Sequence, residues 1–395
     1  GRPDENFPSV VVGGSNGEGS ICAFRSSLLR EAGLKVGLYT SPHLLEWRER
    51  VALDGEPVPP EEFGEAVGEA LRASEGMADE PTPFEVLTAA TMWLFARKGV
   101  DIAVLEVGMG GRLDATNVLS PEICILTPIS YDHMKFLGST LSEIAYEKAG
   151  VLKPDVPAVV APQDGEAMEV IREVASERGV PLVDVGREYR WERTAMRDDG
   201  EEFLIEGPWG KYEVFVPLLG EHQGLNAAVA VAAVDLLRSR GLEVPREAVP
   251  EGLSSLRLLG RISVVGREPW VVVDVAHNAA SAERLRKVLE ERFLGSGRLF
   301  LVFALLRDKD LPRMAEVLGP VAYRAFLPRL DTPRAMPPEE VKDVLSGYVP
   351  CEVYDSVHDA ISEALEGAGR RDVVAVVGSF MLAEQAIYYF GLDVP

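Results

Sequence analysis

A glycine-rich stretch near the N-terminus is the part of the chain whose residue types most clearly suggest chemistry. Residues 10–12 are three consecutive valines, which predict a short buried strand, and the glycine-rich residues 13–20 follow them. Helical spacing then predicts a helix over 21–32. A strand, a glycine-rich loop and a helix in this order bind phosphate through backbone N–H groups at the helix N-terminus. The sequence therefore predicts a phosphate-binding loop, with a purely structural glycine-rich turn as the alternative.

Single positions within this loop both support and oppose that prediction. Gly14, Gly17 and Gly19 would let the backbone approach a phosphate closely, and the hydroxyl of Ser20 is an oxygen ligand of the kind that Mg²⁺ prefers. Glu18 occupies the position at which a phosphate loop has its lysine, and a carboxylate there repels a triphosphate. We expect Glu18 to turn outward, to bind through a metal ion, or to mark the loss of ATP hydrolysis.

Two further candidate metal ligands follow predicted strands. Glu106 lies at the end of a strand expected over 102–107, and His133 follows a strand expected over 123–126. Because the carboxyl ends of parallel strands meet at one edge of a sheet, these two residues could share a magnesium site with Ser20. The alternative for each is a buried polar residue with an ordinary hydrogen-bond partner.

Polar residues on later helices have roles that the sequence leaves open. Lys148 lies near the end of a predicted helix, where a cation also simply complements the helix dipole. One face of a helix expected over 222–240 carries His222, Gln223 and Asn226. These residues could contact a ligand, or they could be capping and surface polar groups.

A third group of polar residues lies in the C-terminal part of the chain. Arg261 stands at an expected domain boundary, and Asp274 and His277 follow a strand expected over 270–274. Residues at such a strand end are typical ligand contacts in α/β proteins.

The order of the predicted elements indicates the fold class. Strands alternating with helices are typical of a parallel sheet, and short extended runs over 189–216 predict a small antiparallel excursion. We predict an α/β protein with a P-loop-type, mostly parallel sheet domain over 1–258 and a smaller, Rossmann-like α/β domain over 259–395. The first strand starts so close to residue 1 that we expect a further N-terminal helix before it.

Composition narrows the range of partners. The formal net charge of −23 over 395 residues argues against nucleic acid, whose phosphates require a basic surface, but it does not exclude ATP. Three widely spaced cysteines form neither a disulfide framework nor a metal-binding spacing, and no apolar run is long enough to cross a bilayer. We expect a cytoplasmic monomer with small-molecule partners, no nucleic acid and no membrane.

Ten segments taken together resemble the folylpolyglutamate synthase/dihydrofolate synthase family, within the Mur ligase superfamily. They extend over nearly the whole chain, and the most specific sequences are LEVGMGGRLDATN at 105–117 and the TSPH at 40–43 that lies within LYTSPHL. The others are GGSNGEGS (13–20), LYTSPHL (38–44), FEVLTA (84–89), DHMKFLG (132–138), EKAGVLKP (147–154), GEHQGLNA (220–227), GRISVV (260–265), DVAHN (274–278) and RDKD (307–310).

This resemblance implies an ATP-dependent ligase of folate biosynthesis and one-carbon metabolism. Enzymes of this family phosphorylate a carboxylate to an acyl phosphate, from which the amino group of L-glutamate displaces phosphate. The acceptor would be a folate or dihydropteroate, and the cofactors would be ATP and Mg²⁺. Metal ions and fixed donors would stabilise the negative charge that develops during the transfer.

The resemblance also assigns roles by position. The ATP-binding residues would be Gly14, Ser15, Asn16, Gly17, Glu18, Gly19 and Ser20, with Asn226 toward the adenine, Arg261 toward the phosphates and Asp274 near the ribose. The metal ligands would be Ser20 and Glu106 for one Mg²⁺ and His133 for a second, with Lys148 carbamylated beside them. The folate end would be bound by Thr40, Ser41, Pro42, His43 and Phe84, and His277 would lie near the glutamate; Lys148, Arg261 and His277 are the expected catalytic residues.

Glu18 is the departure from the family pattern that affects chemistry directly. Loss of one preorganised phosphate donor can remove ~3–4 kcal/mol of transition-state stabilisation. Two alternatives therefore stay open: a catalytically impaired or regulatory homologue that keeps the pocket, and a ligase of the same fold that acts on another carboxylate.

Overall fold

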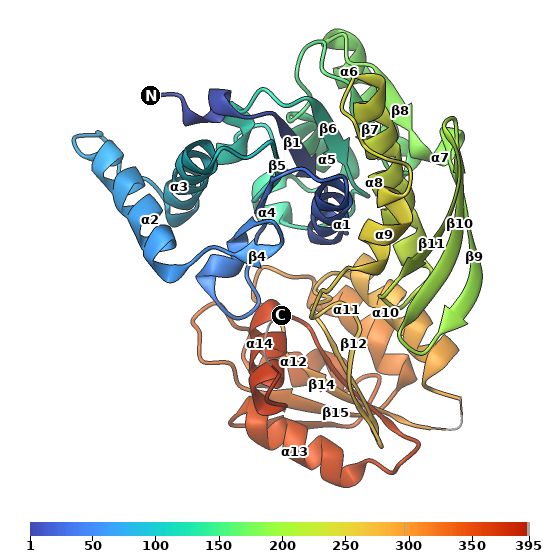
Figure 1. Cartoon of the computed structure of the whole chain (residues 1–395). Coiled ribbons are helices and arrows are strands. Elements are labelled where there is room, and N and C mark those ends of the chain that lie inside the picture. The colour runs from blue at the N-terminus through green and yellow to red at the C-terminus, as the bar shows by residue number, and fades with distance from the viewer. Residues whose placement is uncertain (296, 393–395) are drawn as a thin grey trace. The chain divides into compact units, whose positions relative to one another are not determined.

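The computed structural model describes residues 1–295 and 297–392 (Figure 1). The chain forms two compact units, Gly1–Pro217 with Gln223–Leu256, and Leu218–His222 with Arg257–Pro395. The predicted assignment of residues 1–258 to a P-loop-type domain and of residues 259–395 to a Rossmann-like domain stays a prediction.

The N-terminal unit is built on an eight-stranded sheet in the order β4-β3-β2-β5-β1-β6-β7-β8. Strands β2, β5, β1, β6, β7 and β8 are parallel, whereas β3 and β4 run antiparallel at one edge. Their bounds are Ser9–Gly13 (β1), Val36–Tyr39 (β2), Val51–Leu53 (β3), Glu56–Pro57 (β4), Ile102–Glu106 (β5), Ile123–Leu126 (β6), Ala158–Val160 (β7) and Leu182–Asp184 (β8). Since β1 lies between β5 and β6, the segments that follow these three strands reach the same edge of the sheet.

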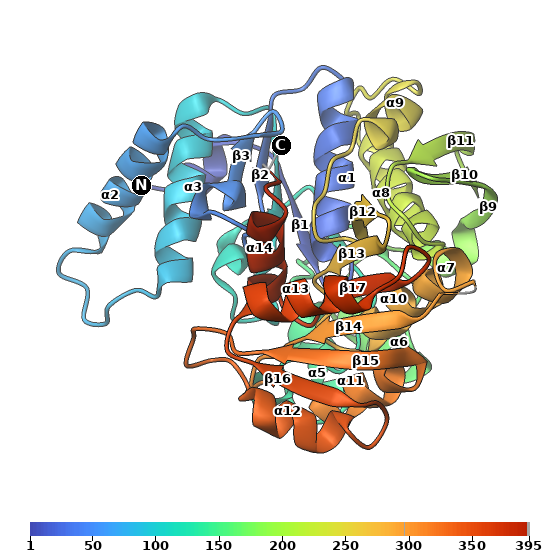
Figure 2. The ribbon, with the colours of Figure 1, turned by 90° about the horizontal axis from the view of Figure 1, so that it is seen from below.

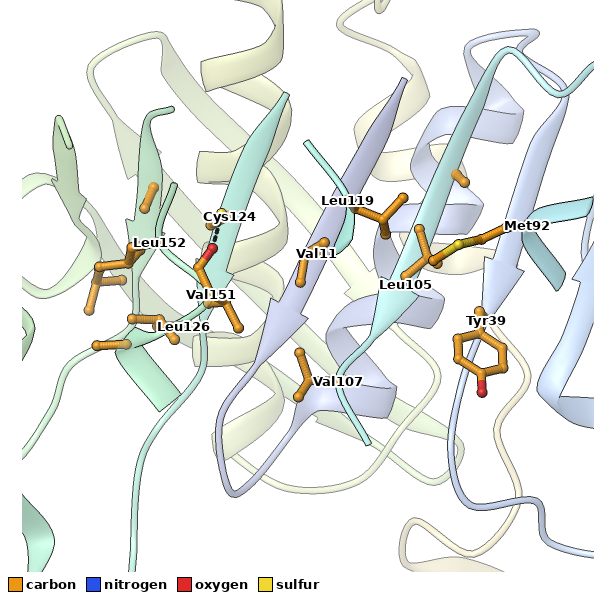
Figure 3. Packing of buried hydrophobic residues seen from close by; sticks show 14 of the residues in the cluster. Val11, Tyr39, Met92, Leu105, Val107, Leu119, Cys124, Leu126, Val151 and Leu152 are labelled. Carbon is orange, nitrogen blue, oxygen red and sulfur yellow. Dashed lines mark hydrogen bonds between the residues drawn. The ribbon is translucent and has the colours of Figure 1, made fainter. Parts of the chain in front are cut away.

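Both faces of this sheet are buried, because its strands carry apolar residues on both sides. Val11 and Leu105 belong to one core, in which Met92 of α3 lies beside Leu105 (Figure 3). Val10 and Val104 alternate with them toward the opposite face and are fully buried as well. A strand that is apolar on both faces is typical of a parallel sheet covered by helices.

Helices cover the two faces of the sheet (Figures 1 and 2). Helix α1 lies against β1, β2 and β5 and also contacts α9, whereas α2 packs on α3 and α5 packs on α6. The helices are Glu18–Glu31 (α1), Pro60–Ser74 (α2), Pro83–Lys98 (α3), Met134–Leu137 (α4), Leu141–Ala149 (α5), Gly165–Glu177 (α6), Val185–Glu188 (α7), His222–Ser239 (α8) and Ala248–Ser254 (α9), with 3₁₀ turns at Pro3–Asn6 (η1), Trp47–Arg50 (η2) and Ala115–Val118 (η3).

The predicted antiparallel excursion is a three-stranded sheet, β11-β10-β9. Its strands are Arg190–Arg197 (β9), Gly200–Gly207 (β10) and Gly210–Val216 (β11). Three side chains from this region and α8 converge on the buried carboxylate of Asp235. These bonds join the small sheet to the long helix α8 that contains Asn226.

The C-terminal unit contains a six-stranded sheet in the order β12-β13-β17-β14-β15-β16, of which β14, β15 and β16 lie side by side in Figure 2. All neighbours are parallel except β12, which pairs antiparallel with β13 at one edge. The elements are Ser263–Arg267 (β12), Trp270–Asp274 (β13), Ala279–Arg292 (α10), Leu299–Phe303 (β14), Leu311–Leu318 (α11), Gly319–Val321 (η4), Ala322–Pro328 (β15), Pro338–Leu345 (α12), Cys351–Tyr354 (β16), Val357–Gly367 (α13), Val373–Val377 (β17) and Phe380–Tyr389 (α14).

The structure confirms the predicted fold class, an α/β chain with a mostly parallel sheet followed by a second, smaller α/β sheet. It differs at the start of α1, which begins at Glu18 rather than at Ile21. Gly17 precedes the helix with a left-handed φ of 88°, so residues 18–20 form the first helical turn instead of a loop. Among the described residues, none of the helices combines the length and apolarity needed to cross a membrane.

Candidate functional site: the edge of the sheet beside β1, β5 and β6

The predicted phosphate-binding loop connects β1 to α1 and is fixed by the segment that follows β6. The backbone N–H groups of Ser15 and Asn16 both donate to the carbonyl oxygen of Pro128, at 3.1 and 3.2 Å. The Ser15 hydroxyl donates to the Ser130 carbonyl at 3.1 Å, and the Asn16 amide donates to the Ser130 hydroxyl at 2.7 Å. Ser15 and Asn16 therefore shape the loop, and their amides are already used within the protein.

The amides suited to an anion are those of the first turn of α1. The first N–H groups of a helix have no acceptor within the helix, and together with the helix dipole they favour a negative ligand. Two glycines allow the chain to reach this turn. A Cβ atom at Gly14 would lie 1.8 Å from the hydroxyl oxygen of Thr127, and a Cβ at Gly17 would lie 2.8 Å from Oδ1 of Asn226. Glycine is therefore required at both positions of the loop, and phosphate binding at the first turn of α1 stays a prediction.

Lys148 extends from the last turn of α5 to this loop. Its side chain is buried, and its Nζ donates a hydrogen bond to the carbonyl oxygen of Gly14. A lysine that only complemented the helix dipole would not need to contact the loop. The hydrogen bond to Gly14 therefore favours a role for Lys148 at the loop.

Glu106 at the end of β5 is buried beside the segment that follows β2. Its Oε2 accepts a hydrogen bond of 2.8 Å from the backbone N–H of Ser41. The register of the sheet pairs Glu106 with Val12, immediately before the loop. Glu106, Ser41 and the phosphate loop are therefore brought together at one edge of the sheet.

His133 lies after β6 in a left-handed conformation, with φ of 50°, directly before the short helix α4. Its backbone N–H donates to Oδ1 of the buried Asp132 at 2.7 Å, and its Nε2 lies 3.9 Å from the same oxygen. Asp132 thus fixes the backbone of the residue expected at a second metal ion, and its carboxylate lies near the imidazole.

The donor set at this edge suits a magnesium ion that is shared with a nucleotide. The Ser20 hydroxyl and the Glu106 carboxylate are oxygen donors, which Mg²⁺ prefers. Over residues 1–295 and 297–392, no cluster of three or more histidine, cysteine, aspartate or glutamate side chains could hold a metal by itself. Mg²⁺ usually binds through one or two protein ligands together with substrate phosphates and water, so this pattern fits a metal that arrives with ATP.

Asn226 on α8 lies against the phosphate loop. Its Oδ1 is the atom that blocks a side chain at Gly17, and its Nδ2 donates to Oε1 of Gln223 at 3.0 Å. Both amide side chains are almost fully buried. The structure therefore places Asn226 beside the loop, and its expected contact with adenine stays a prediction.

The loop after β5 is organised by Asp114, a residue that the sequence analysis did not assign. Its Oδ2 accepts from the backbone N–H groups of Gly108 and Met109 at 3.1 and 3.0 Å, and its Oδ1 accepts from the N–H and the hydroxyl of Thr116 at 3.0 and 2.7 Å. An aspartate directly before a short 3₁₀ turn is a capping signal, and it could have identified this residue from the sequence.

The same loop contacts the residue expected at the folate end. A Cβ at Gly108 would lie 2.4 Å from Cζ of Phe84, and the Phe84 ring lies 5.8 Å from the ring of Tyr39. Phe84 on α3 therefore packs between β2 and the loop after β5.

His43 contacts two residues that follow it in the sequence. Nε of Arg50 donates to Nδ1 of His43 at 2.9 Å, and the His43 ring lies 4.9 Å from the ring of Trp47. Burial, and then the Arg50 cation, hold the pKa of His43 below its usual value. The sequence analysis did not identify Arg50 as a site residue, because only the fold shows that it contacts His43.

In the C-terminal unit, Arg261 and His277 lie against the ring of Phe380, and Asp274 organises the backbone beside them. The Arg261 guanidinium carbon lies 5.3 Å from the Phe380 ring centroid, and the His277 ring lies 6.2 Å from it. The two carboxylate oxygens of Asp274 accept from the backbone N–H groups of Ile262 and Ala276, at 2.8 and 2.7 Å.

Asp274 therefore fixes the turn that presents Arg261. Burial raises the pKa of its carboxyl group, and the two backbone donors and Arg261 oppose that rise. The contact of Asp274 with a ribose stays a prediction.

Comparisons with known proteins identify the family. Residues 12–234 match the model of the Mur ligase middle domain, and residues 260–380 match the Mur ligase glutamate ligase domain. The dihydrofolate synthase/folylpolyglutamate synthase of Bacillus subtilis is 33% identical, over 96% of this chain and 89% of that protein. The chain belongs to the dihydrofolate synthase/folylpolyglutamate synthase family of the Mur ligases.

Solved structures of family members agree along the whole chain. Folylpolyglutamate synthase of Mycobacterium tuberculosis, complexed with ADP and AMPPCP, superposes with a TM-score of 0.91 at 31% identity, covering 100% of this chain and 93% of that one. Escherichia coli FolC in complex with DHPP and ADP gives 0.88 at 33% identity, over 97% of this chain and 88% of that one. Members of this family are ATP-dependent ligases that form C–N bonds, and this chain is one of them.

Proposed function

We propose that this ligase joins the amino group of L-glutamate to the carboxylate of dihydropteroate or of a folate. The observation that carries the proposal is the meeting of four segments at one edge of the sheet. The phosphate loop is bonded to Lys148, and Glu106 beside it is bonded to the backbone of Ser41. Solved relatives described with DHPP and ADP, and with manganese, AMPPNP and L-glutamate, support the same choice of substrates.

The proposed reaction has two steps. The acceptor carboxylate takes the γ-phosphoryl group of ATP, so the β–γ bridging bond breaks, an acyl phosphate forms and ADP remains. The amine of glutamate then attacks the carbonyl carbon and loses a proton, and inorganic phosphate leaves. The first turn of α1 binds the phosphates. Ser20 and Glu106 would hold Mg²⁺ there, and the ion would supply positive charge against the negative charge that develops on the transferred group.

The protein groups act mainly by position. Lys148 supports the loop through Gly14 and, if carbamylated, adds an anion to the metal site; His133 serves a second metal. In the C-terminal unit, Arg261 supplies a cation to the phosphates, and His277 lies on the glutamate side. Thr40, Ser41, Pro42, His43 and Phe84 form the proposed folate end, where His43 is a neutral hydrogen-bonding group.

The experiment that tests this function measures ADP release by the purified full-length chain with MgATP and L-glutamate. We expect release that depends on glutamate with dihydropteroate, with tetrahydrofolate, or with both, and an acceptor product heavier by one glutamate residue in mass spectrometry. Release with neither acceptor would contradict a folate ligase, and activity with another carboxylic acid in the same assay would indicate a different acceptor.

Glu18 favours a second candidate, a homologue that keeps the site without turning over. In that case wild type would release no ADP, and Glu18→Lys would create activity. Measurable turnover by wild type would exclude this candidate, and Glu18→Gln serves as the control that removes the charge without adding a cation.

We also propose that the chain works as a cytoplasmic monomer. Cys22 and Cys124 are buried free thiols, which suits a reducing compartment. Light scattering coupled to gel filtration at micromolar protein measures the mass, and a value near 86 kDa, about twice the chain mass of 43.0 kDa, would contradict a monomer.

A further inference from the structure

Helix α1 contains a buried cation that no hydrogen bond explains. Arg25 is 0% exposed, and none of its three guanidinium nitrogens has a hydrogen-bond partner in the described part of the chain. Burial lowers its pKa to about 9, which leaves the guanidinium protonated at neutral pH. Burying a cation without a partner lowers the free energy of unfolding. Stabilisation of the fold therefore does not explain why an arginine occupies this position.

Arg25 lies on the same face of α1 as Glu18. Seven residues correspond to nearly two full turns, so the two Cα atoms lie one above the other, roughly 10 Å apart along the helix axis. Long side chains on a helix lean toward its N-terminus. The Arg25 side chain therefore leans toward the phosphate loop.

We propose that Arg25 is a positioning residue that offsets the missing loop lysine, because its field from inside α1 favours the polyphosphate that Glu18 disfavours. The inference rests on the proposed nucleotide site at this loop. A charge within a low-dielectric interior acts over several ångströms and is weakly screened by salt, so it needs no direct contact with the phosphates. The cost of burying Arg25 is then offset only when the polyanion is bound.

The test compares Arg25→Met, which removes the charge and keeps much of the volume, with wild type in direct binding of adenosine, AMP, ADP and ATP with Mg²⁺. We expect affinity for MgATP to fall about tenfold, with a smaller loss for ADP and AMP and none for adenosine, because Coulomb energy scales with ligand charge. The melting temperature of the free protein should rise, since an unpaired buried cation has been removed.

Matched variants separate this role from packing. Arg25→Lys keeps a cation and should bind MgATP within about twofold of wild type, and Arg30→Met makes the same charge change at the far end of α1 and should leave binding unchanged. Glu18→Lys combined with Arg25→Met should restore tight binding.

Two outcomes would overturn the proposal. Unchanged MgATP affinity in Arg25→Met would exclude an electrostatic role, and an equal loss for adenosine and ATP would show that Arg25 acts through packing alone. Absence of ATP binding by wild type would instead reject the nucleotide site itself, so the two failures are distinguishable.

Discussion

Oε2 of Glu106 accepts a hydrogen bond of 2.8 Å from the backbone N–H of Ser41. The bond joins the acid at the end of β5 to the segment after β2, so a single carboxylate orients two parts of the proposed site. Glu106 is 6% exposed, and loss of its carboxylate would leave the Ser41 N–H in a buried environment.

Two substitutions of Glu106 should therefore differ in stability and agree in activity. Glu106→Gln keeps an acceptor for the Ser41 N–H but removes the charged metal ligand, so we expect turnover to fall about 100- to 1,000-fold while folding is nearly unchanged. Glu106→Ala should lose the same activity and in addition about 1–3 kcal/mol of stability, because the N–H has lost its acceptor.

Glutamate-dependent ADP release across a magnesium titration, together with urea unfolding, checks this prediction. Glu122→Gln, at an exposed residue before β6, is the matched control and should alter neither quantity. Wild-type turnover in Glu106→Gln would contradict the metal role.

His43 should stay neutral in the folded protein at a pH where a free histidine begins to protonate. Between its lowered folded pKa and the unfolded value of about 6.5, the unfolded state binds more protons, so stability rises with pH and is lost as the pH falls below about 6.5. His43→Gln should remove this part of the pH dependence.

Histidine NMR titration measures the pKa directly, with His358, whose side chain is largely exposed, as the internal control. In Arg50→Leu the pKa of His43 should rise, because the neighbouring cation and its Nε–H donor are gone. An unchanged or lower pKa of His43 in that variant would exclude Arg50 as a cause.

Asp114 should control binding of the acceptor acid through the loop after β5. Asp114→Ala removes the acceptor for four hydrogen bonds to residues 108, 109 and 116 and frees the loop that packs on Phe84. We expect the KM for the acceptor to rise about tenfold, which corresponds to about 1.4 kcal/mol, while the KM for ATP changes less than about twofold.

Steady-state kinetics with each substrate varied in turn distinguishes this effect from general damage. Asp101→Ala is the control, because Asp101 also accepts a backbone N–H, that of Lys35 at 2.7 Å, away from the loop. Equal increases in both KM values would contradict a role specific to the acceptor.

The sequence predicted the buried strands well, because apolar runs bounded by polar residues have few alternative structures. The strands predicted at 123–126 and 270–274 match residue for residue. The start of α1 was placed three residues late, since a Gly-Glu-Gly-Ser sequence has low helix propensity and only the left-handed Gly17 begins the helix there.

The contacts between segments were less predictable. Glu106 was predicted at a strand end, but its partner, the Ser41 N–H, is a backbone group that no sequence pattern reveals. From the sequence, Lys148 could simply complement the dipole of its helix, and only the structure shows its hydrogen bond to Gly14. Arg25 gave no signal, because burial of a charged residue depends on the packing of α1 on three strands and α9.

The last prediction concerns Asp235, which lies outside the proposed site and should affect stability alone. Its fully buried carboxylate accepts from the hydroxyls of Tyr189 and Tyr212, at 3.1 and 2.9 Å, and from Nη1 of Arg238 at 3.0 Å. Asp235→Leu leaves the mostly buried Arg238 cation and two hydroxyls without this acceptor, so we expect a loss of about 3–5 kcal/mol.

Denaturant unfolding of Asp235→Leu, Asp235→Asn and Tyr212→Phe should give a graded series. Asp235→Asn keeps one oxygen acceptor and should lose less than Asp235→Leu. Tyr212→Phe removes the hydroxyl that donates to Asp235 and accepts from Arg238, and should cost about 1–2 kcal/mol. Turnover of each variant, measured well below its melting temperature, should match wild type, because the network only joins α8 to the three-stranded sheet. Asp235 and Asn226 lie more than two helical turns apart on α8, so a variant that folds as stably as wild type but has lost turnover would contradict this separation of roles.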